Sequence, residues 1–498
     1  MQSHRLSRLF AILPYVALAL IASCSGGSSG SNNSSNLPDF ENVSNEVGIG
    51  NVGALGQTAA WGDFNSDGKQ DLIVANTDTD IDSSSRNVFL FKNEGNETFS
   101  DVTSETGILD LPLRSAAWAD FNNDGFLDLV VGTIKSGDPP MLYKNSVDGV
   151  FVDFSEEAGI TRRGGEIGHT IWVDYDRDGL VDLFHANSGQ SYLYHNQGDD
   201  KFREVSEESG LGEFNTNSAI WFDFNNDGFP DLFLANDGLN RLYLNNGGRT
   251  FTNITDEARV GGDPGWNSVA ACIGDFNGDR FFDLYVVNIS SPRNALYRNN
   301  GDGTFTDITF ETGTEDVGDG RTCAWVDFDN DGRLDLFATN HVNPTKLFRN
   351  LGSGKFVDVA PQVGLDSPID VFTATWGDYN NDGFMDVFLN GHIGTGLMEN
   401  SGTENNFLII ELHGGELLTN TSAIGTRVEV STSSGIQIRE VSGGRGCCEQ
   451  DMLPIHFGVG NKNEVDIQVQ WTDGDECNFP NVNVEGARLF MISEDECI

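Results

Sequence analysis

The sequence predicts an all-β fold, a seven-bladed β-propeller followed by a small C-terminal β domain. A nine-residue phrase with Asp at positions 1, 5 and 9 recurs seven times, at intervals of 49 to 57 residues. Each interval holds about four short runs of β-forming residues, separated by Gly, Asn and Asp, which is typical of strands and turns. Helical periodicity is almost absent, so short helices of one turn are the most that we expect.

Repeating units of this length with four strands are typical of propeller blades. Closure of the units into a ring leaves no long exposed sheet edge. We therefore expect the propeller over residues 39–405 and a separate β domain over residues 406–498. A Trp stands two residues before six of the seven phrases, and we interpret this stripe as packing between blades.

The bulk composition limits the class of partner. The chain has 498 residues and a formal net charge of -47, from 76 acidic and 29 basic side chains. Nucleic acid is excluded as a partner, because its phosphates would be repelled. Hydrophobic residues make up 38% of the chain, which is enough for a core, so the acidity does not indicate disorder.

The N-terminal residues predict export. Two arginines precede an apolar run that is too short to span a membrane, and residues 1–23 are typical of a signal peptide. The run Ile21-Ala22-Ser23-Cys24 resembles the bacterial lipobox, which implies a lipid on the Cys24 thiol; an ordinary signal peptide is the alternative. Residues 24–38 are rich in Ser, Gly and Asn and predict a flexible tether. We expect a lipid-anchored protein of the cell envelope, at the outer membrane or cell surface.

The repeated phrase predicts calcium sites. Side-chain oxygens at positions 1, 3, 5 and 9 and a backbone carbonyl at position 7 can converge on one cation, and Gly at position 6 permits the turn. All the donors are hard oxygens, and Ca²⁺ suits such a cage better than Mg²⁺. We number the phrases loop 1 to loop 7 and expect up to seven sites. The predicted ligands are Asp63, Asn65, Asp67 and Asp71 (loop 1); Asp120, Asn122, Asp124 and Asp128 (loop 2); Asp174, Asp176, Asp178 and Asp182 (loop 3); Asp223, Asn225, Asp227 and Asp231 (loop 4); Asp275, Asn277, Asp279 and Asp283 (loop 5); Asp327, Asp329, Asp331 and Asp335 (loop 6); and Asp378, Asn380, Asp382 and Asp386 (loop 7).

Loop 5 departs from the pattern. It carries Arg280 where the other loops have Gly. A positive φ costs energy at a residue with a Cβ, and the guanidinium charge stands close to the cation. We therefore expect the Asp275 loop to bind calcium most weakly.

The cysteine count suggests disulfides in an exported chain. Two of the six cysteines after Cys24 occupy nearly equivalent places in neighbouring repeats, so we expect Cys272 and Cys323 to pair. The other four should pair among themselves. A bridge between the adjacent Cys447 and Cys448 would be strained, so each is expected to pair with one of the last two. Those last two are Cys477 and Cys497.

The end of the ring opposite the loops is the predicted ligand face. The residues just before the innermost strands differ from repeat to repeat, as recognition would require. Two histidines follow the second strand of their repeats, where a polar residue usually caps a turn, and a place on the ligand face is the alternative. The candidates are Gln57, Arg114, His169, Asn217, Arg321, His341, Phe372 and His392.

These phrases resemble known families. The repeat over roughly residues 39–405 resembles the FG-GAP/VCBS repeats of integrin α-subunit propellers, which implies the same calcium loops. The phrases Ile424–Val428, Ser442–Gly446 and His456–Gly460 resemble the ASPIC/UnbV domain of the cartilage acidic protein family and its bacterial relatives. Cys447-Cys448 departs from the aromatic or aliphatic pair expected there. We interpret Ser442–Gly446 as a Gly-rich turn, with an anion cradle as the alternative.

No catalytic arrangement is identified. Gly-x-Ser-x-Gly and His-Glu-x-x-His are both absent. We therefore expect a monomeric, calcium-stabilised, surface-anchored binding or adhesion protein that recognises a protein or glycan. A polysaccharide lyase or hydrolase using His169, Arg321 or His341 is the alternative, and a wall-associated spacer is a third.

Overall fold

The computed structural model describes the chain from Leu37 to Cys497, with short gaps. The predicted signal peptide and Cys24 lie outside the described residues, as does all but the last two residues of the tether. None of the described helices is long and apolar enough to cross a membrane. The gaps are residues 51, 53–55, 77–85, 135–137, 162–167, 291–292, 367–369, 393–394, 416–418, 446–447 and 487.

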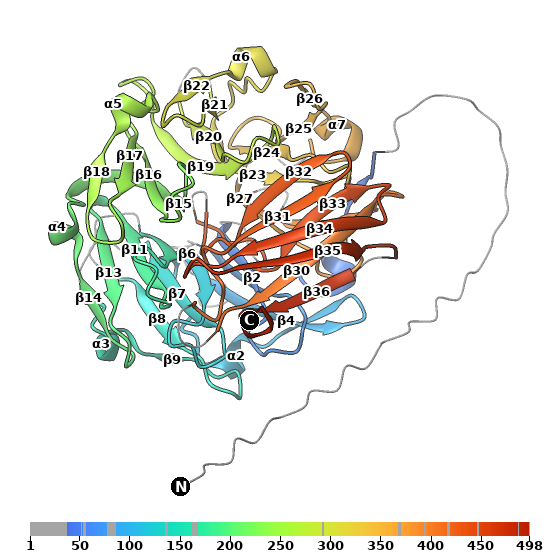
Figure 1. The fold of residues 1–498 in the computed structure, drawn as a ribbon. Coiled ribbons are helices and arrows are strands. Elements are labelled where there is room, and N and C mark those ends of the chain that lie inside the picture. Colours follow the sequence, from blue (N-terminus) through green and yellow to red (C-terminus); the bar gives the residue numbers. More distant parts are fainter. Residues whose placement is uncertain are drawn as a thin grey trace, which may run out of the picture. The chain divides into compact units, whose positions relative to one another are not determined.

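The described strands between Phe40 and Asn400 form seven antiparallel sheets, which we number as repeat sheets 1 to 7 (Figure 1). This confirms the predicted all-β class. In each sheet the chain runs from an inner strand outward. The sheets are β2 (Gly56–Gly62), β3 (Asp71–Asn76), β4 (Val88–Gly95) and β5 (Thr98–Asp101); β6 (Leu113–Ala119), β7 (Asp128–Thr133), β8 (Met141–Lys144) and β9 (Val152–Asp153); β10 (His169–Val173), β11 (Asp182–Ala186), β13 (Tyr192–Asn196) and β14 (Phe202–Glu204); β15 (Glu213–Phe222), β16 (Asp231–Asn236), β17 (Arg241–Asn245) and β18 (Phe251–Asn253), with β12 (Ser188–Gln190) added beside β15; β19 (Ser268–Gly274), β20 (Asp283–Asn288), β21 (Ala295–Asn299) and β22 (Phe305–Asp307); β23 (Gly320–Val326), β24 (Asp335–Asn340), β25 (Lys346–Asn350) and β26 (Phe356–Asp358); and β27 (Val371–Gly377), β28 (Asp386–Gly391) and β29 (Gly396–Asn400), with β1 (Phe40–Asn42).

The inner strands contact one another in cyclic order. Each of β2, β6, β10, β15, β19 and β23 contacts the inner strand of the next sheet, and β27 contacts β2. Repeat sheet 7 is completed by the N-terminal strand β1, which pairs antiparallel with β29, Phe40 opposite Asn400. The sheets therefore close into a ring that joins the two ends of the repeat region.

One hydrogen bond is repeated between every pair of adjacent sheets. The Asn of each Leu-Tyr-x-Asn type phrase donates its side-chain N–H to the backbone carbonyl at position 2 of the preceding sheet's loop, at 2.8 to 2.9 Å. The bond from sheet 1 to sheet 7 completes the circle. Because these amides are buried, each bond is worth more than an exposed one. The pairs are Asn93–Tyr379, Asn145–Phe64, Asn196–Phe121, Asn245–Tyr175, Asn299–Phe224, Asn350–Phe276 and Asn400–Phe328.

The repeated Trp residues pack between sheets. The Trp118 ring lies 5.8 Å from that of Phe151. Its indole N–H donates to the carbonyl of Ala60 in the preceding sheet, at 3.4 Å. Trp61 makes the equivalent bond to Thr375, across the junction that closes the ring, at 3.3 Å. Burial of large aromatic rings at one repeated place makes the junctions the main apolar core.

Each outer strand is followed by a single helical turn. Most of these turns end at a Gly in the left-handed conformation, such as Gly159 with φ of 85°. A Cβ at Gly107 would lie 2.6 Å from the carbonyl oxygen of Phe151, just before the outer strand of the next sheet, so Gly is required there. The turns are α1 (Ser44–Val47), α2 (Thr103–Thr106), α3 (Ser155–Ala158), α4 (Ser206–Ser209), α5 (Thr255–Ala258), α6 (Thr309–Thr312) and α7 (Ala360–Val363).

The C-terminal region forms two further sheets. One has the order β33-β30-β36, in which β30 and β36 are parallel, and the other has the order β32-β31-β34-β35. A short 3-10 turn follows. The elements are β30 (Asn406–His413), β31 (Arg427–Thr432), β32 (Gly435–Glu440), β33 (Ile455–Gly460), β34 (Glu464–Gln470), β35 (Glu476–Asn483), β36 (Arg488–Ser493) and η1 (Glu494–Glu496).

The disulfides agree with the prediction in part. Cys272 on β19 and Cys323 on β23 are bridged, so one disulfide joins the inner strands of neighbouring sheets. Cys477 pairs with Cys497, and the preference for pairing each of these with Cys447 or Cys448 is wrong. The reason is position, since Cys448 is buried in the ring at the Thr58 hydroxyl, which donates to its carbonyl. Cys447 lies outside the described residues.

A loop of the C-terminal domain enters the centre of the ring. We call its described residues, 441–445 and 448–454, the plug loop. Gly443 pairs with Trp172 of β10, and the Gln450 side chain exchanges hydrogen bonds with the backbone of Trp118 at 2.6 and 3.0 Å. Asp451 accepts the backbone N–H of Trp376 at 2.7 Å. In Figure 1 the C-terminal strands, orange to red, lie across the ring.

Arg445 anchors the plug loop. Its guanidinium donates to the carbonyl of Ala374 at 2.9 Å. The same group pairs with Glu449 at 2.9 Å and with Asp451 at 2.6 Å. Glu449 in turn accepts a hydrogen bond from the Thr322 hydroxyl. The described part of the Gly-rich turn, Ser442 to Arg445, is therefore part of a contact with the ring rather than an open anion cradle, because two carboxylates already pair with the guanidinium.

Candidate metal loops and the bulge face

The first Asp of each loop shapes its turn. In loop 2, Asp120 accepts the N–H of Asp124 at 3.0 Å and that of Gly125 at 2.7 Å, one on each carboxylate oxygen. Asp124 then accepts the N–H of Phe126 at 3.2 Å. The same bonds recur in loops 1, 4, 6 and 7. Positions 1 and 5 are therefore held on one side of the turn.

The last Asp of each loop is anchored at the sheet junction. Asp128 is fully buried and accepts the N–H of Asn145 at 2.7 Å and that of Phe121 at 3.2 Å. Asn145 is the residue whose side chain donates a hydrogen bond to the preceding sheet. Position 9 is thereby tied to the hydrogen bond that joins the sheets, so the loop and the ring share one anchor.

The predicted ligands converge most clearly in loops 3 and 6. In loop 3 the oxygens of Asp174, Asp176 and Asp182 lie within 4.8 Å of one another, and the Asp cluster of loop 6 meets the same limit. The loop 6 cluster is Asp327, Asp329 and Asp335. The five loops with Asn at position 3 are also compact, since its amide donates to position 5 or 9, at 2.9 to 3.4 Å.

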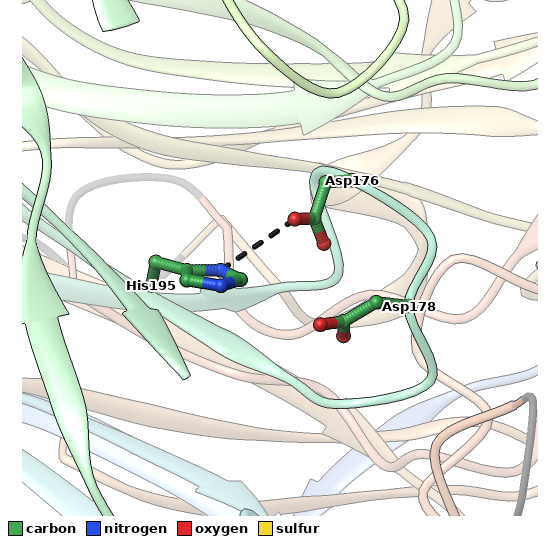
Figure 2. Close-up of side chains that lie close together, drawn as sticks. All are labelled: Asp176, Asp178 and His195. Atoms are coloured by element: carbon green, nitrogen blue, oxygen red, sulfur yellow. Dashed lines mark ion pairs between the residues drawn. The ribbon is translucent and has the colours of Figure 1, made fainter. Parts of the chain in front are cut away.

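Each of these two clusters has a neighbouring side chain that the sequence interpretation missed. His195 of β13 lies 3.5 Å from Asp176 and 3.3 Å from Asp182, and Figure 2 shows it facing the loop 3 carboxylates. In loop 6 the equivalent Arg349 lies 2.6 Å from Asp329. Each directly precedes the Asn whose side chain bonds to the preceding sheet. The residue at this position changes from repeat to repeat, and that variation could have identified it from the sequence.

Burial and mutual repulsion raise the pKa values of the loop carboxyls. The pKa of Asp71 is raised to about 8, first by burial and then by neighbouring Asp charges. For the same reasons the pKa of Asp174 rises to about 7 and that of Asp231 to about 9. Buried oxygens of Asp176 and Asp335 have no hydrogen-bond partner. Such carboxylates fit a hard divalent cation, which would replace both the lost water and the missing partners.

Loop 5 has the strained conformation that its sequence predicts. Arg280 has a φ of 71°, in the left-handed region that favours Gly. Its guanidinium turns to the C-terminal domain and pairs with both oxygens of Glu429, at 2.6 and 2.9 Å. The arginine is therefore held by an ion pair outside the loop.

The C-terminal domain contacts the acidic loops directly. Thr421 donates its hydroxyl to Asp120 at 2.6 Å and its N–H to Asn123 at 3.0 Å in loop 2. The described contacts reach loops 3 to 7 as well. They are Arg177–Thr472 in loop 3, Asn226–Arg427 in loop 4, Arg280–Glu429 in loop 5, Asn330–Gly460 in loop 6 and Gly383–His456 in loop 7.

The other end of the inner strands carries a repeated β-bulge. The pairing register shifts at Gln57, Arg114, Asn217, Arg321 and Phe372, which are predicted ligand-face residues. It shifts also at Val269, which the sequence interpretation missed. A bulge leaves its residue outside the ladder and re-aims the side chain. We call these six positions the bulge face. His169, also a predicted ligand-face residue, stands one residue later in the register, where it pairs with Ala186 as Ser115 pairs with Gly132.

Neighbouring members of the bulge face touch one another. Arg114 donates to Gln57 across the junction of sheets 1 and 2. Asn217 donates to the carbonyl of Ser268 at 2.9 Å, and Arg321 lies 4.6 Å over the ring of Phe372. The structure thus brings together residues far apart in the sequence, in a band around one end of the ring.

His341 and His392 join this band through one carboxylate. The Nδ1 atom of His392 lies 2.7 Å from Asp370, and that of His341 pairs with the other Asp370 oxygen. The rings of Phe372 and His392 are 4.9 Å apart. Asp370 was not predicted, because it precedes its strand in irregular backbone without a repeated signal. The expected turn-capping role does not describe these imidazoles, since their side chains bind Asp370.

His169 is buried without a partner. It is 1% exposed, and neither ring nitrogen has a hydrogen bond. Burial, with smaller contributions from Arg114 and His185, lowers its pKa to about 3, so the imidazole is neutral. His185, which was not predicted, is equally buried and its pKa is also lowered to about 3 by burial.

A ring of four-stranded sheets with an acidic turn after each inner strand defines a propeller-like repeat protein. The FG-GAP-like repeat matches residues 63–131, 174–234, 223–286, 275–338 and 327–389, more than half of the chain. The chain belongs to the FG-GAP-like repeat family. The ASPIC and UnbV family matches residues 416–497.

Part of the chain is similar to cartilage acidic protein 1 of vertebrates. The Xenopus tropicalis protein is 39% identical over 113 residues, 22% of this chain and 17% of the relative. The Homo sapiens protein is 25% identical over 260 residues, 39% of this chain and 39% of the relative. The chain thus aligns with less than half the length of these relatives.

Solved structures with similar folds include two lectins and a lyase. An Agrocybe aegerita lectin that recognises non-reducing terminal N-acetylglucosamine has a TM-score of 0.39 at 21% identity, covering 60% of this chain and 77% of its own. The BP39L lectin of Burkholderia pseudomallei has a TM-score of 0.44 at 13% identity, covering 70% and 97%. The exotype rhamnogalacturonan lyase YesX has a TM-score of 0.38 at 14% identity, covering 67% and 60%.

Proposed function

We propose that this chain is a calcium-stabilised, seven-bladed propeller that binds a protein or glycan on its bulge face. One observation carries the proposal: the residues at one end of the inner strands hardly vary between repeats, whereas those at the other end do. At one end the acidic loop repeats with little change, as a structural device would. At the other end the bulged residue changes from sheet to sheet, from Gln57 to Arg114 to Phe372, as recognition requires.

Calcium is proposed for up to seven loops, with the predicted ligands at positions 1, 3, 5 and 9. Bound Ca²⁺ would neutralise the converging carboxylates. In loop 6, Arg349 already pairs with Asp329, so this site depends less on the cation for charge balance. In loop 5, the strained Arg280 supports the expectation of the weakest site. A cation bound only to the folded ring stabilises it by mass action.

Export and anchoring are proposed on separate grounds. Two disulfides in the described chain are typical of an oxidising compartment. The sequence of residues 1–23 adds a signal peptide, and Cys24 adds the lipidated residue, followed by the tether of residues 24–38. We propose a monomeric protein held at the cell envelope with its ring in the extracellular or periplasmic medium.

The test of the binding proposal begins with calorimetric titration of the chelated full chain with Ca²⁺. The calcium-loaded chain is then applied to a glycan array and to extracellular proteins of the source cell. The proposal requires a ligand whose binding falls when Phe372 is changed to Ala. Binding that survives this substitution and every other change on the bulge face would contradict it.

A carbohydrate-active enzyme is the second candidate, and one observation favours it. Asp370 engages the Nδ1 atoms of both His341 and His392, which fixes the two rings and directs their Nε2 atoms elsewhere. An imidazole held in this way suits general acid–base chemistry. Polysaccharide turnover that is lost in His341→Gln, while binding of the same polymer persists, would support this role over binding alone.

A further inference from the structure

We propose that loop 3 binds a divalent transition cation of the Zn²⁺ type, and that the Nδ1 atom of His195 is one of its ligands. This inference deepens the proposed function, because it rests on cations in the acidic loops and changes the identity of one of them. It combines the donor atoms of the loop, the distances between them and the polar atoms that lack a hydrogen-bond partner.

Loop 3 brings a nitrogen donor into a set of carboxylate oxygens. In the described part of the chain, donor atoms of Asp176, Asp178 and His195 lie within 4.8 Å of one another. Asp176 also belongs to the cluster with Asp174 and Asp182, and Asp182 lies 3.3 Å from the imidazole. Figure 2 shows His195 of β13 facing Asp176 and Asp178 of the loop. One imidazole nitrogen and several carboxylate oxygens thus converge on one place.

The type of donor atom decides which cation fits. Ca²⁺ and Mg²⁺ are bound in proteins by oxygen atoms, whereas an imidazole nitrogen among carboxylates suits Zn²⁺ and related first-row cations. The comparable cluster of loop 6 consists of carboxylates alone, and the loops with Asn at position 3 offer amide and carboxylate oxygens. Loop 3 therefore departs from a calcium site in the chemistry of its donors.

The distances in loop 3 match two ligands of one cation better than they match a direct hydrogen bond. The His195 Nδ1 atom lies 3.3 Å from Asp182 and 3.5 Å from Asp176. A charge-assisted hydrogen bond from nitrogen to a carboxylate is shorter, at about 2.7–2.9 Å. Two ligands that are each about 2.0–2.1 Å from a tetrahedral cation lie about 3.3–3.4 Å apart.

Loop 6 shows the alternative, a charge partner at the same position. Loops 3 and 6 have Asp rather than Asn at position 3, so each has a fourth carboxylate. In loop 6 the residue equivalent to His195 is Arg349, which lies 2.6 Å from Asp329. A guanidinium has donors only and cannot be a metal ligand. His195 stands farther from its carboxylates, and a neutral imidazole has a lone pair to give to a cation.

Two atoms of the loop 3 cluster point independently to a ligand. The Oδ1 atom of Asp176 and the Nδ1 atom of His195 are both buried, and neither has a hydrogen-bond partner. Buried polar atoms in folded proteins are nearly always paired. A cation would accept a lone pair from each of these atoms, so one bound ion accounts for both.

The test is a calorimetric titration of the full chain with Zn²⁺ in an excess of Ca²⁺, which fills the all-oxygen loops first. We expect one tight Zn²⁺ equivalent. His195→Arg gives loop 3 the arrangement of loop 6, with a positive charge but no ligand. It should weaken the tight equivalent by at least about a hundredfold, since even a side chain that only orients a ligand is worth about ten- to a hundredfold. His413→Gln is the matched control, because His413 also lies beside a carboxylate, 3.4 Å from Glu411, but outside the acidic loops.

The remaining outcomes separate this inference from the proposed function. Absence of a Zn²⁺ equivalent in excess Ca²⁺, or a tight equivalent that persists in His195→Arg, overturns the inference. His195→Gln provides the same test if His195→Arg fails to fold. Co²⁺ bound to the unaltered chain should give the absorption spectrum of nitrogen and oxygen ligands, and thiolate bands would assign the ion to cysteine and overturn the inference.

Calcium is measured separately by the melting temperature of the same samples. A chain that Ca²⁺ stabilises but that has no Zn²⁺ site loses only this inference. A chain that binds Zn²⁺ through His195 but gains no stability from Ca²⁺ keeps this inference and loses the proposed calcium of the other loops.

Discussion

The two ends of the inner strands differ in what surrounds them. At the loop end, seven similar acidic turns are tied into the sheet junctions, and the C-terminal domain contacts six of them. At the bulge end, the side chains differ and lie against one another in a band. The comparison teaches that one repeated strand can serve two purposes, because its two ends are under separate constraints.

Removal of calcium should have the largest effect, and it tests the loop end alone. A site that is filled at a hundred times its Kd contributes about 2.7 kcal/mol, and several sites act together. We expect EDTA to lower the melting temperature by about 10 °C or more, as measured by circular dichroism. Readdition of Ca²⁺ should restore it. An unchanged melting temperature would show that the acidic loops are stable without a cation.

Loss of the plug anchor should have the next largest effect. Arg445→Ala leaves the buried Glu449 charge and the half-buried Asp451 charge without their partner, and breaking a buried ion pair typically costs about 3–5 kcal/mol. We expect a lower unfolding midpoint in urea and faster proteolysis between the propeller and the C-terminal domain. Arg203→Ala removes an exposed pair and is the control, with a change below about 0.5 kcal/mol. Equal midpoints for the two variants would mean that the plug loop does not hold the domains together.

The effect of pH should separate the calcium-free from the calcium-loaded chain. In the unfolded chain Asp titrates near 3.9, whereas burial raises the folded pKa of Asp71 to about 8 and of Asp231 to about 9. The folded state therefore binds more protons, and its stability falls as pH rises toward these values. Between pH 6.5 and 8, urea unfolding in EDTA should show this decline.

Calcium should flatten that decline, because the cation takes the place of the proton on the loop carboxyls. The window above pH 6.5 avoids the buried histidines, whose lowered pKa values act in the opposite direction at lower pH. Parallel slopes with and without calcium would argue against metal binding at these carboxyls.

A smaller effect is expected within the loop end, at loop 5. Arg280→Gly relieves a positive φ that costs about 1 kcal/mol at a non-Gly residue, and removes a cation next to the loop. We expect the weakest calcium affinity in a titration to increase. Glu429→Gln also breaks the ion pair but keeps the strain, so it separates charge from conformation. An unchanged weakest site in Arg280→Gly would place that site in another loop.

The smallest effects should come from the bulge end. His341→Gln and Arg321→Gln change half-buried side chains at the bulge end, away from the repeated Asn and Trp contacts that join the sheets, and we expect the free energy of unfolding to shift by less than about 0.5 kcal/mol. Calorimetry under the same conditions should still report altered ligand binding. A large loss of stability instead would mean that the bulge face is part of the scaffold.

Local signals in the sequence were sufficient for the repeated parts of the molecule. Cys272 and Cys323 occupy equivalent places in adjacent repeats, so their bridge could be predicted from register alone. The positions of the acidic loops and of the variable residues at the strand ends could be predicted from the repeat in the same way. Residues at equivalent positions of the sequence repeats occupy equivalent positions in the structure, because each sheet is built like the one before it.

The unrepeated parts could not be predicted in this way. Arg445 and Gln450 bind the centre of the ring through a docking that no local pattern encodes. The pairing of Cys477 with Cys497 depends on how β35 and the chain end meet in the C-terminal domain. Asp370 lies in irregular backbone, and its role appears only once two sheets place His341 and His392 on either side of it.

The short strand β1 forms the junction at which the ring is closed. It joins the last sheet through three residue pairs with β29, and Phe40 packs on Trp376 at 6.0 Å. A force applied to the chain before Leu37 reaches the ring first through this strand. If residues before Leu37 hold the molecule as proposed, tension would act first on this junction, and the pairing of β1 with β29 would break before the other junctions open.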